Sequence, residues 1–230
     1  MKQPLLKRVL VEMLFVPIAL LFIVIELGRA NSNVFLWVQE QSGATPLSIH
    51  ALLFLVNVAL SLWILWGFAC VLVVGRRIIK NPAGRSRSSV SIVRKEARKY
   101  VFSLFLTDIL RDCGTVLWSI LLVVPGIVYR TRTAFFAVVT ICEGKEYRDA
   151  LHGSSATVRG STLGVLWRLI GLYLMLVIPA WIMTFFIFRI AQAYIEQAVF
   201  VAALLSAVPL SIAALFYQLS TVHLYKALKS

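Results

Sequence analysis

Residues 121–160 read LLVVPGIVYRTRTAFFAVVTICEGKEYRDALHGSSATVRG, an interrupted apolar stretch that carries charged residues. The apolar run breaks at Pro125-Gly126, resumes after two arginines and closes at an acidic residue followed by glycine. A bilayer offers no water to satisfy broken backbone hydrogen bonds, and charges beside such a break are costly. We therefore expect the functional residues here. Pro125-Gly126 is the candidate hinge. The candidate residues for binding a ligand or a lipid phosphate are Arg130, Arg132 and Glu143.

The composition of the 230-residue chain is that of a membrane protein. Hydrophobic residues make up 60% and charged residues 14%, with a mean hydropathy of +0.87. A globular core of this size cannot hide so much apolar surface. The 23 basic and 10 acidic residues give a net charge of +13, and the basic residues gather beside apolar runs. This placement favours anionic lipid at cytoplasmic membrane edges as the partner and excludes nucleic acid, which needs basic surface interleaved with aromatic residues.

Apolar runs alternate with polar and basic segments along the whole chain. The dense basic loop 76–99 and the charged segment 144–162 are cytoplasmic by the positive-inside rule, whereas the polar loop 28–46 is external. The fourth run reaches the length of a span only if residues 127–132 are included. The sequence thus predicts an all-α, single-domain, polytopic bundle of about six transmembrane helices with both termini in the cytoplasm. The predicted spans are 9–27, 47–75, 101–125, 127–143, 163–188 and 198–222.

The third run carries a polar stripe that leaves two interpretations open. Its members follow spacings of three and four, which places them on one face of a helix: Asp108, Arg111, Asp112, Thr115 and Ser119. The stripe either faces an internal cavity or forms a self-neutralising charge cluster near the cytoplasmic end. Alternatively, residues 94–112 form an interfacial amphipathic helix, and the span begins at Cys113. Helices three and four then either cross fully or form a re-entrant hairpin around the Pro-Gly break.

Local signals predict where helices begin and bend. The segment Asn81-Pro-Ala-Gly84 ends a helix, and serines that follow it offer an N-cap for a new helix near Ser91. Pro179 is expected to kink the fifth span, and Pro209 lies in the middle of the sixth. Arg189 and Glu196 mark a short external turn between these two spans.

Motifs for catalysis or metal binding are absent from the sequence. The cysteines, at positions 70, 113 and 142, lie within apolar runs and are interpreted as packing residues. There is no CxxC, no HExxH, no GxSxG elbow and no glycine-rich nucleotide loop. The carboxylates do not repeat a spacing that would hold a metal for phosphoryl transfer. We therefore predict a protein that is not an enzyme and has no metal or cofactor.

The opening stretch resembles a family of bacterial membrane proteins related to the membrane domain that precedes glycerophosphodiester phosphodiesterases, which includes the uncharacterised YciC-like proteins. About forty residues carry the resemblance, in order: Pro125-Gly126-Ile127, Arg132, Glu143-Gly144, Ala150-Leu151, Ser154 and Arg159-Gly160. Arg130 is an additional arginine, and no soluble phosphodiesterase domain follows. The resemblance implies a six-helix fold in the bacterial cytoplasmic membrane and no specific activity.

Three functional hypotheses follow for a non-enzymatic integral membrane protein. The first is lipid handling or membrane homeostasis, motivated by the arginines beside the break. The second is a scaffold or accessory subunit of a membrane complex, with a protein partner or a second copy of the chain. The third is a small-solute permease that uses the polar stripe on helix three.

Overall fold

The computed structural model describes residues 8–30, 46–80, 90–194 and 199–229, and every regular element within these ranges is a helix. The predicted all-α class is thus confirmed. Most of loop 28–46, the segment 81–84 and residue 196 lie outside the described residues. The elements are η1 (Leu10–Phe15), α2 (Val16–Ala30), α4 (Pro46–Lys80), α5 (Val90–Leu121), α6 (Val123–Arg132), α7 (Phe136–Glu143), α8 (Tyr147–Val158), α9 (Thr162–Leu172), η2 (Tyr173–Val177), α10 (Ile178–Tyr194) and α11 (Val199–Lys229).

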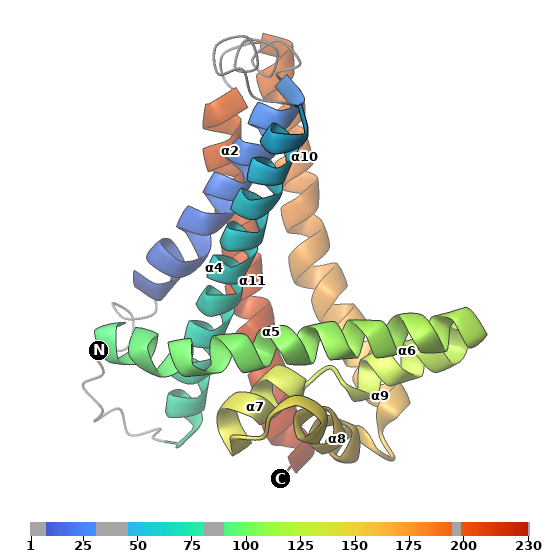
Figure 1. Ribbon diagram of the computed structural model, residues 1–230. Coiled ribbons are helices and arrows are strands. Elements are labelled where there is room, and N and C mark those ends of the chain that lie inside the picture. The colour runs from blue at the N-terminus through green and yellow to red at the C-terminus, as the bar shows by residue number, and fades with distance from the viewer. Residues whose placement is uncertain (1–7, 31–45, 81–89, 195–198, 230) are drawn as a thin grey trace.

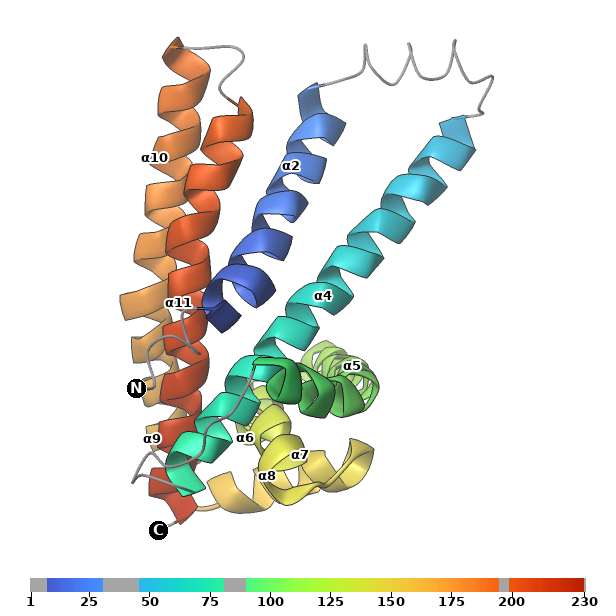
Figure 2. The same ribbon diagram turned by 90° about the vertical axis from the view of Figure 1, so that its left-hand side faces the viewer.

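The upper part of the molecule is a bundle of long apolar helices, α2, α4, α10 and α11 (Figures 1 and 2). Within the described residues, three helical segments are long and apolar enough to cross a membrane: Phe54–Arg77, Thr162–Ala191 and Val201–Lys229. A shorter apolar helix covers Leu10–Val24. These segments correspond to the second, fifth, sixth and first predicted runs, so the chain has the helices of an integral membrane protein. The count of six spans is not confirmed.

Small residues let the bundle helices approach closely. A Cβ atom on Gly67 of α4 would lie 2.1 Å from the backbone oxygen of Met13 in η1, so only glycine fits at this crossing. On the other side of the bundle, the Thr184 hydroxyl of α10 donates to the backbone oxygen of Ser206 in α11 at 3.4 Å. Membrane helices associate through such backbone approaches and polar contacts, because apolar packing alone gains little in lipid.

The helix from Thr162 to Tyr194 changes its hydrogen-bonding pattern close to Pro179, where the sequence predicts a kink. Residues Tyr173–Val177 form a π-helical turn directly before Pro179. Proline has no N–H and its ring clashes with the carbonyl of residue i−4, here Met175, so a widened turn at this point accommodates it. Pro209, in contrast, lies inside the continuous helix α11.

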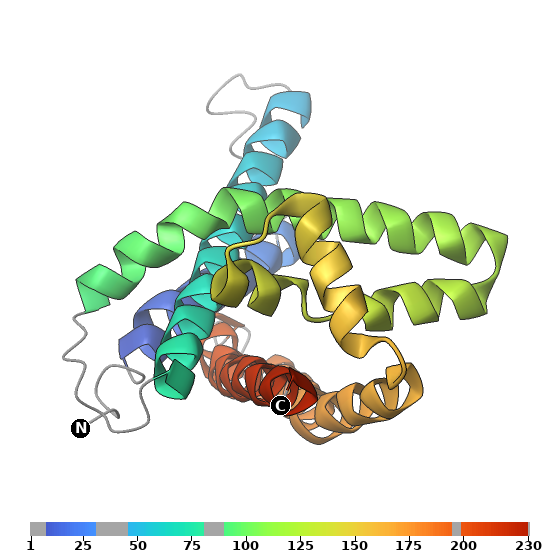
Figure 3. The same cartoon turned by 90° about the horizontal axis from the view of Figure 1, so that it is seen from below.

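Helices α5 and α6 form a hairpin that lies across the bundle, close to its lower end (Figures 1 and 3). The sequence predicts spans at 101–125 and 127–143, but α5 starts at Val90 and runs across α4 and α11 instead of alongside them (Figures 1 and 2). The start of α5 agrees with the helix predicted near Ser91. Residues 127–143 do not form one helix, because a turn at residues 133–135 separates α6 from α7. Helix α5 is continuous through residues 94–112 and past Cys113, so the full span and the interfacial helix followed by a span from Cys113 both stay predictions.

The break in the hairpin precedes the predicted hinge. Leu122 alone has an extended backbone, and Pro125-Gly126 belongs to the first turn of α6, where a missing N–H is tolerated. Gly126 is needed for a different reason. A Cβ atom there would lie 2.1 Å from the Ser119 hydroxyl oxygen and 3.1 Å from the Ser119 Cα of α5. The dipeptide thus starts α6 and holds it close against α5.

The end of the hairpin exposes a continuous apolar surface. Leu121, Leu122, Val123 and Val124 are all at least 65% exposed, and Ile120 is 76% exposed. No charged residue occurs from position 113 to position 129. A soluble protein rarely exposes such a patch, whereas lipid covers it without cost.

A lower layer of α7 and α8 packs beneath the hairpin (Figures 1 and 3). Gly144 ends α7 in the left-handed conformation, at φ 72°, and its N–H donates to the Thr140 carbonyl at 3.1 Å. The buried Ser154 hydroxyl of α8 donates to the Arg132 carbonyl at 2.7 Å and accepts from the Phe135 N–H at 3.1 Å. Ser154 thereby satisfies two backbone groups left open at the turn between α6 and α7.

Ion pairs surround the lower end of the bundle. Glu96 of α5 pairs with Arg76 and Arg77 at the end of α4, and Arg94 pairs with Glu12 of η1. The Arg76 guanidinium also donates to the backbone oxygen of Ile141, near the C-terminus of α7, at 2.6 Å. These contacts fix the base of the hairpin at the charged lower edge of the apolar bundle.

Candidate functional site

Helix α6 presents two faces, each of which lines a separate cavity. Residues 127, 130, 131 and 134 face the bundle, and residues 125, 128, 129 and 132 face α8. Both sets follow the i, i+3, i+4, i+7 spacing of a helix face. Arg130 and Arg132 therefore point into different cavities, although only Thr131 separates them in sequence.

The bundle-side cavity lies between the hairpin and the apolar helices α4, α9 and α11, with a volume of about 650 Å³. Its walls are mostly apolar, and its charged groups are Asp108, Arg111 and Arg130. Tyr217 and Gln218 of α11 add polar atoms. A cavity of this size with few polar groups has the character of a site for an amphipathic ligand.

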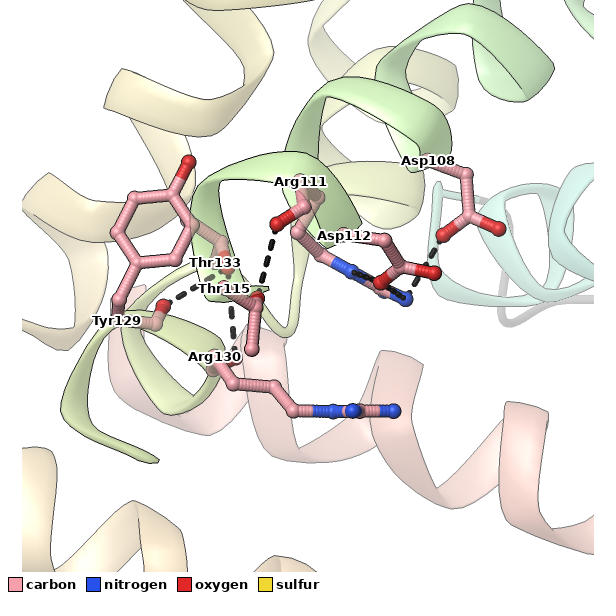
Figure 4. Close-up of polar contacts among 7 residues, drawn as sticks. All are labelled: Asp108, Arg111, Asp112, Thr115, Tyr129, Arg130 and Thr133. Carbon is pink, nitrogen blue, oxygen red and sulfur yellow. Dashed lines mark hydrogen bonds and ion pairs between the residues drawn. The ribbon is translucent and has the colours of Figure 1, made fainter. Parts of the chain in front are cut away.

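Arg111 is held in place on three sides (Figure 4). Its guanidinium lies 2.8 Å from the Asp108 carboxylate and 3.0 Å from the Asp112 carboxylate. It also lies over the Phe136 ring, 4.8 Å from the ring centroid. Burial raises the pKa of Asp108, while Arg111 and, more weakly, Arg130 oppose that rise. The two carboxylates therefore neutralise the charge of Arg111, and together with the Phe136 ring they fix the position of its side chain.

Arg130 differs from Arg111 because its guanidinium has no hydrogen bond or ion pair with any described residue. Figure 4 shows its side chain extending to the same side as Arg111, while the ring of the neighbouring Tyr129 points away from it. Within the described lining, the cavity holds two arginines and one aspartate. Of the two arginines in this lining, Arg130 is the one without a hydrogen bond or ion pair from its guanidinium to a described residue.

The α8-side cavity, of about 900 Å³, lies on the opposite face of the hairpin. Arg132 enters it from α6, and Arg148 and His152 enter it from α8. The Arg132 Nε lies 3.5 Å from the Thr162 hydroxyl, which leaves the terminal nitrogens open. None of the described lining residues is acidic. The sequence reasoning missed Arg148 and His152, although residues 148, 151, 152 and 155 share one face of α8 by their spacing.

Glu143 lies in neither cavity and binds the C-terminal end of α11 instead. Its carboxylate accepts a hydrogen bond from the Tyr225 hydroxyl and lies 2.5 Å from Lys229 Nζ and 2.9 Å from Lys145 Nζ. Hydrogen bonds from Lys229, Tyr225 and Lys145 lower the pKa of Glu143 to about 2. This candidate ligand residue thus joins α7 to α11, and its oxygens already have three donors.

The predicted polar stripe does not line one continuous surface. Asp108 and Arg111 reach the bundle-side cavity, whereas the exposed Asp112 remains outside its lining. The Thr115 hydroxyl donates to the backbone oxygen of Arg111 at 2.8 Å, and Ser119 packs against α6. The stripe is therefore divided between one cavity and the contact within the hairpin.

Within the described residues, no group of three His, Cys, Asp or Glu side chains gathers to hold a metal ion. Cys70 is buried and Cys113 is exposed, and neither takes part in a disulfide. Comparison of the chain with protein-family models, with curated proteins and with solved structures finds no match.

Proposed function

We propose that this chain is a non-enzymatic membrane protein that binds an anionic lipid in the bundle-side cavity. The observation that carries this proposal is the unpaired Arg130 guanidinium in a cavity whose remaining walls are largely apolar. An ion without a partner is costly to hold beside apolar side chains, and an arginine binds phosphate through several N–H groups. A phospholipid supplies both the phosphate and the chains that such a cavity requires.

The surroundings of the cavity are consistent with entry of lipid from the bilayer. Helix α9 and the π-turn that follows it line the cavity, and they expose apolar side chains that include Trp167, Leu174 and Met175. The end of the hairpin exposes further apolar side chains. We place the hairpin flat in the cytoplasmic interface of the bacterial inner membrane, with its end in hydrocarbon and both chain termini in the cytoplasm.

The experiment is native mass spectrometry of the full chain purified in mild detergent. We expect the wild type to retain anionic lipid and the Arg130→Gln variant to lose it, with at least about a tenfold lower ratio of bound to free protein, because a charge-assisted phosphate contact is removed. Arg159→Gln, an exposed arginine outside both cavity linings, is the matched control and should retain lipid.

The scaffold hypothesis predicts a different outcome for the same variant. If Arg130 has only a structural role, Arg130→Gln lowers the yield of folded protein while the folded fraction shows no loss of bound lipid. Retention of lipid at the level of the wild type would overturn the proposal. The permease hypothesis has less support among the described residues, since only Asp108 and Arg111 of the polar stripe line the bundle-side cavity.

A further inference from the structure

The α8-side cavity has the features of a second anion site. Unlike the bundle-side cavity, it has no acidic residue in its described lining. Two arginines and a histidine converge in it, and none of its described lining residues is acidic. Neither Arg148 nor His152 has a hydrogen bond or ion pair with a described residue. Like charges repel one another, so an arrangement that brings the Arg132 and Arg148 guanidinium groups into one cavity is stabilised by an anion between them.

The opposite end of the same cavity is apolar. Leu117 and Trp118 of α5 and Pro125 of α6 line it, and they lead to the exposed end of the hairpin. The basic residues come from the C-terminal end of α6, which carries Arg132, and from α8, which carries Arg148 and His152. The cavity thus combines basic and apolar lining, as the headgroup and chains of a lipid require.

We infer that the α8-side cavity binds the phosphate headgroup of an anionic phospholipid through Arg132 and Arg148. His152 and the hydroxyl groups of Tyr129 and Ser155 lie in the same lining and supply further polar contacts. The apolar end favours a lipid over free phosphate. The hairpin would then hold one lipid phosphate on each face, and the site does not depend on Arg130 or on the bundle-side cavity.

Cys113 provides a native reporter of this site, because it is exposed and lines the α8-side cavity. The experiment measures the rate at which maleimide modifies Cys113 in the full chain, reconstituted in phosphatidylcholine nanodiscs, by peptide mass spectrometry. Cys142 in the same sample is the internal reference. The added probes are dihexanoyl phosphatidylglycerol, dihexanoyl phosphatidylcholine and inorganic phosphate.

We expect dihexanoyl phosphatidylglycerol to slow modification of Cys113 at concentrations where the phosphatidylcholine analogue and inorganic phosphate have little effect. The Arg132→Gln, Arg148→Gln variant should need at least about tenfold more of the anionic lipid for half protection. The Arg132→Lys, Arg148→Lys variant keeps both charges and should retain most of the protection. Arg130→Gln should leave it unchanged, even where it abolishes binding in the bundle-side cavity.

Two results would overturn the inference. Protection that is the same in the double glutamine variant as in the wild type would show that these arginines bind no headgroup. Equal protection by inorganic phosphate and by the anionic lipid would show that the cavity recognises free phosphate instead of a lipid.

Discussion

Replacement of Glu143 by glutamine should loosen the attachment of α11 to α7 and destabilise the lower layer. The two lysines that pair with this carboxylate are 46% and 58% exposed at their side chains, so each pair contributes at most about 1 kcal/mol. The hydrogen bond from the buried Tyr225 hydroxyl to a charged acceptor is worth about 1.5–3 kcal/mol, and glutamine keeps part of it. We expect a net loss of about 2 kcal/mol.

The assay is thermal unfolding of the purified chain in detergent, followed by circular dichroism. For a chain of this size, a loss of about 2 kcal/mol lowers Tm by roughly 4–8 °C. Glu146→Gln is the matched control: its exposed carboxylate, three residues further on, has no ion pair with a described residue and should leave Tm unchanged. Tyr225→Phe should lower Tm by a smaller amount, and its effect should largely disappear in the Glu143→Gln background.

The dependence of this effect on pH follows from the lowered pKa of Glu143. The pKa is about 2 in the folded chain, against about 4.5 for an ordinary glutamate. Because the folded pKa is depressed, the stabilisation is complete above about pH 5 and is lost as the pH falls toward 2. The difference in Tm between the wild type and Glu143→Gln should narrow over that range. Equal Tm values at pH 7, or a difference that does not change down to pH 2, would refute the reasoning.

Three further changes test the hairpin. Gly126→Ala forces a methyl group against the Ser119 backbone and should cost about 1–3 kcal/mol, whereas Gly164→Ala, with open space around its Cα, should be neutral or slightly stabilising in thermal unfolding. Ser154→Ala leaves two buried backbone groups without their partner and should cost about 1–3 kcal/mol in the same assay. A spin label on Leu121→Cys, in a chain without other cysteines, should be accessible to oxygen but not to a water-soluble nickel complex; strong spin–spin coupling would indicate contact with a second copy instead.

Hydropathy was sufficient to predict the helical membrane class and four of the apolar runs, because helix length and apolar content determine which segments suit a bilayer. Hydropathy could not predict how α5 is oriented relative to the other helices of the bundle. The residues at the hairpin end, 113–129, are as apolar as a span, and hydropathy does not distinguish a helix that crosses a membrane from one that lies in its plane. The charges between positions 94 and 112 were the local sign that motivated the interfacial alternative.

The candidate site could be predicted only in part for a related reason. The break in the helix indicated the correct segment, and both arginines reach cavities. Their spacing of two residues places them on opposite sides of a helix, which the sequence shows as soon as the helix is assigned. The partners that complete each cavity, Asp108 on α5 and Arg148 on α8, come from helices whose packing against α6 depends on the tertiary fold. The pair Glu143-Gly144 ends α7, and Glu143 binds Lys229 of α11. This role could not be predicted from the sequence, because it depends on where the C-terminal helix lies in the fold.

The most direct test of the account is a density map of the full chain in a nanodisc that contains phosphatidylglycerol, with a bound antibody fragment to aid alignment. We expect density for a lipid phosphate against the Arg130 guanidinium, with its chains running between α4 and α9 in the bundle-side cavity. A bundle-side cavity without lipid density, or Arg130 paired with a protein carboxylate in the membrane, would contradict it.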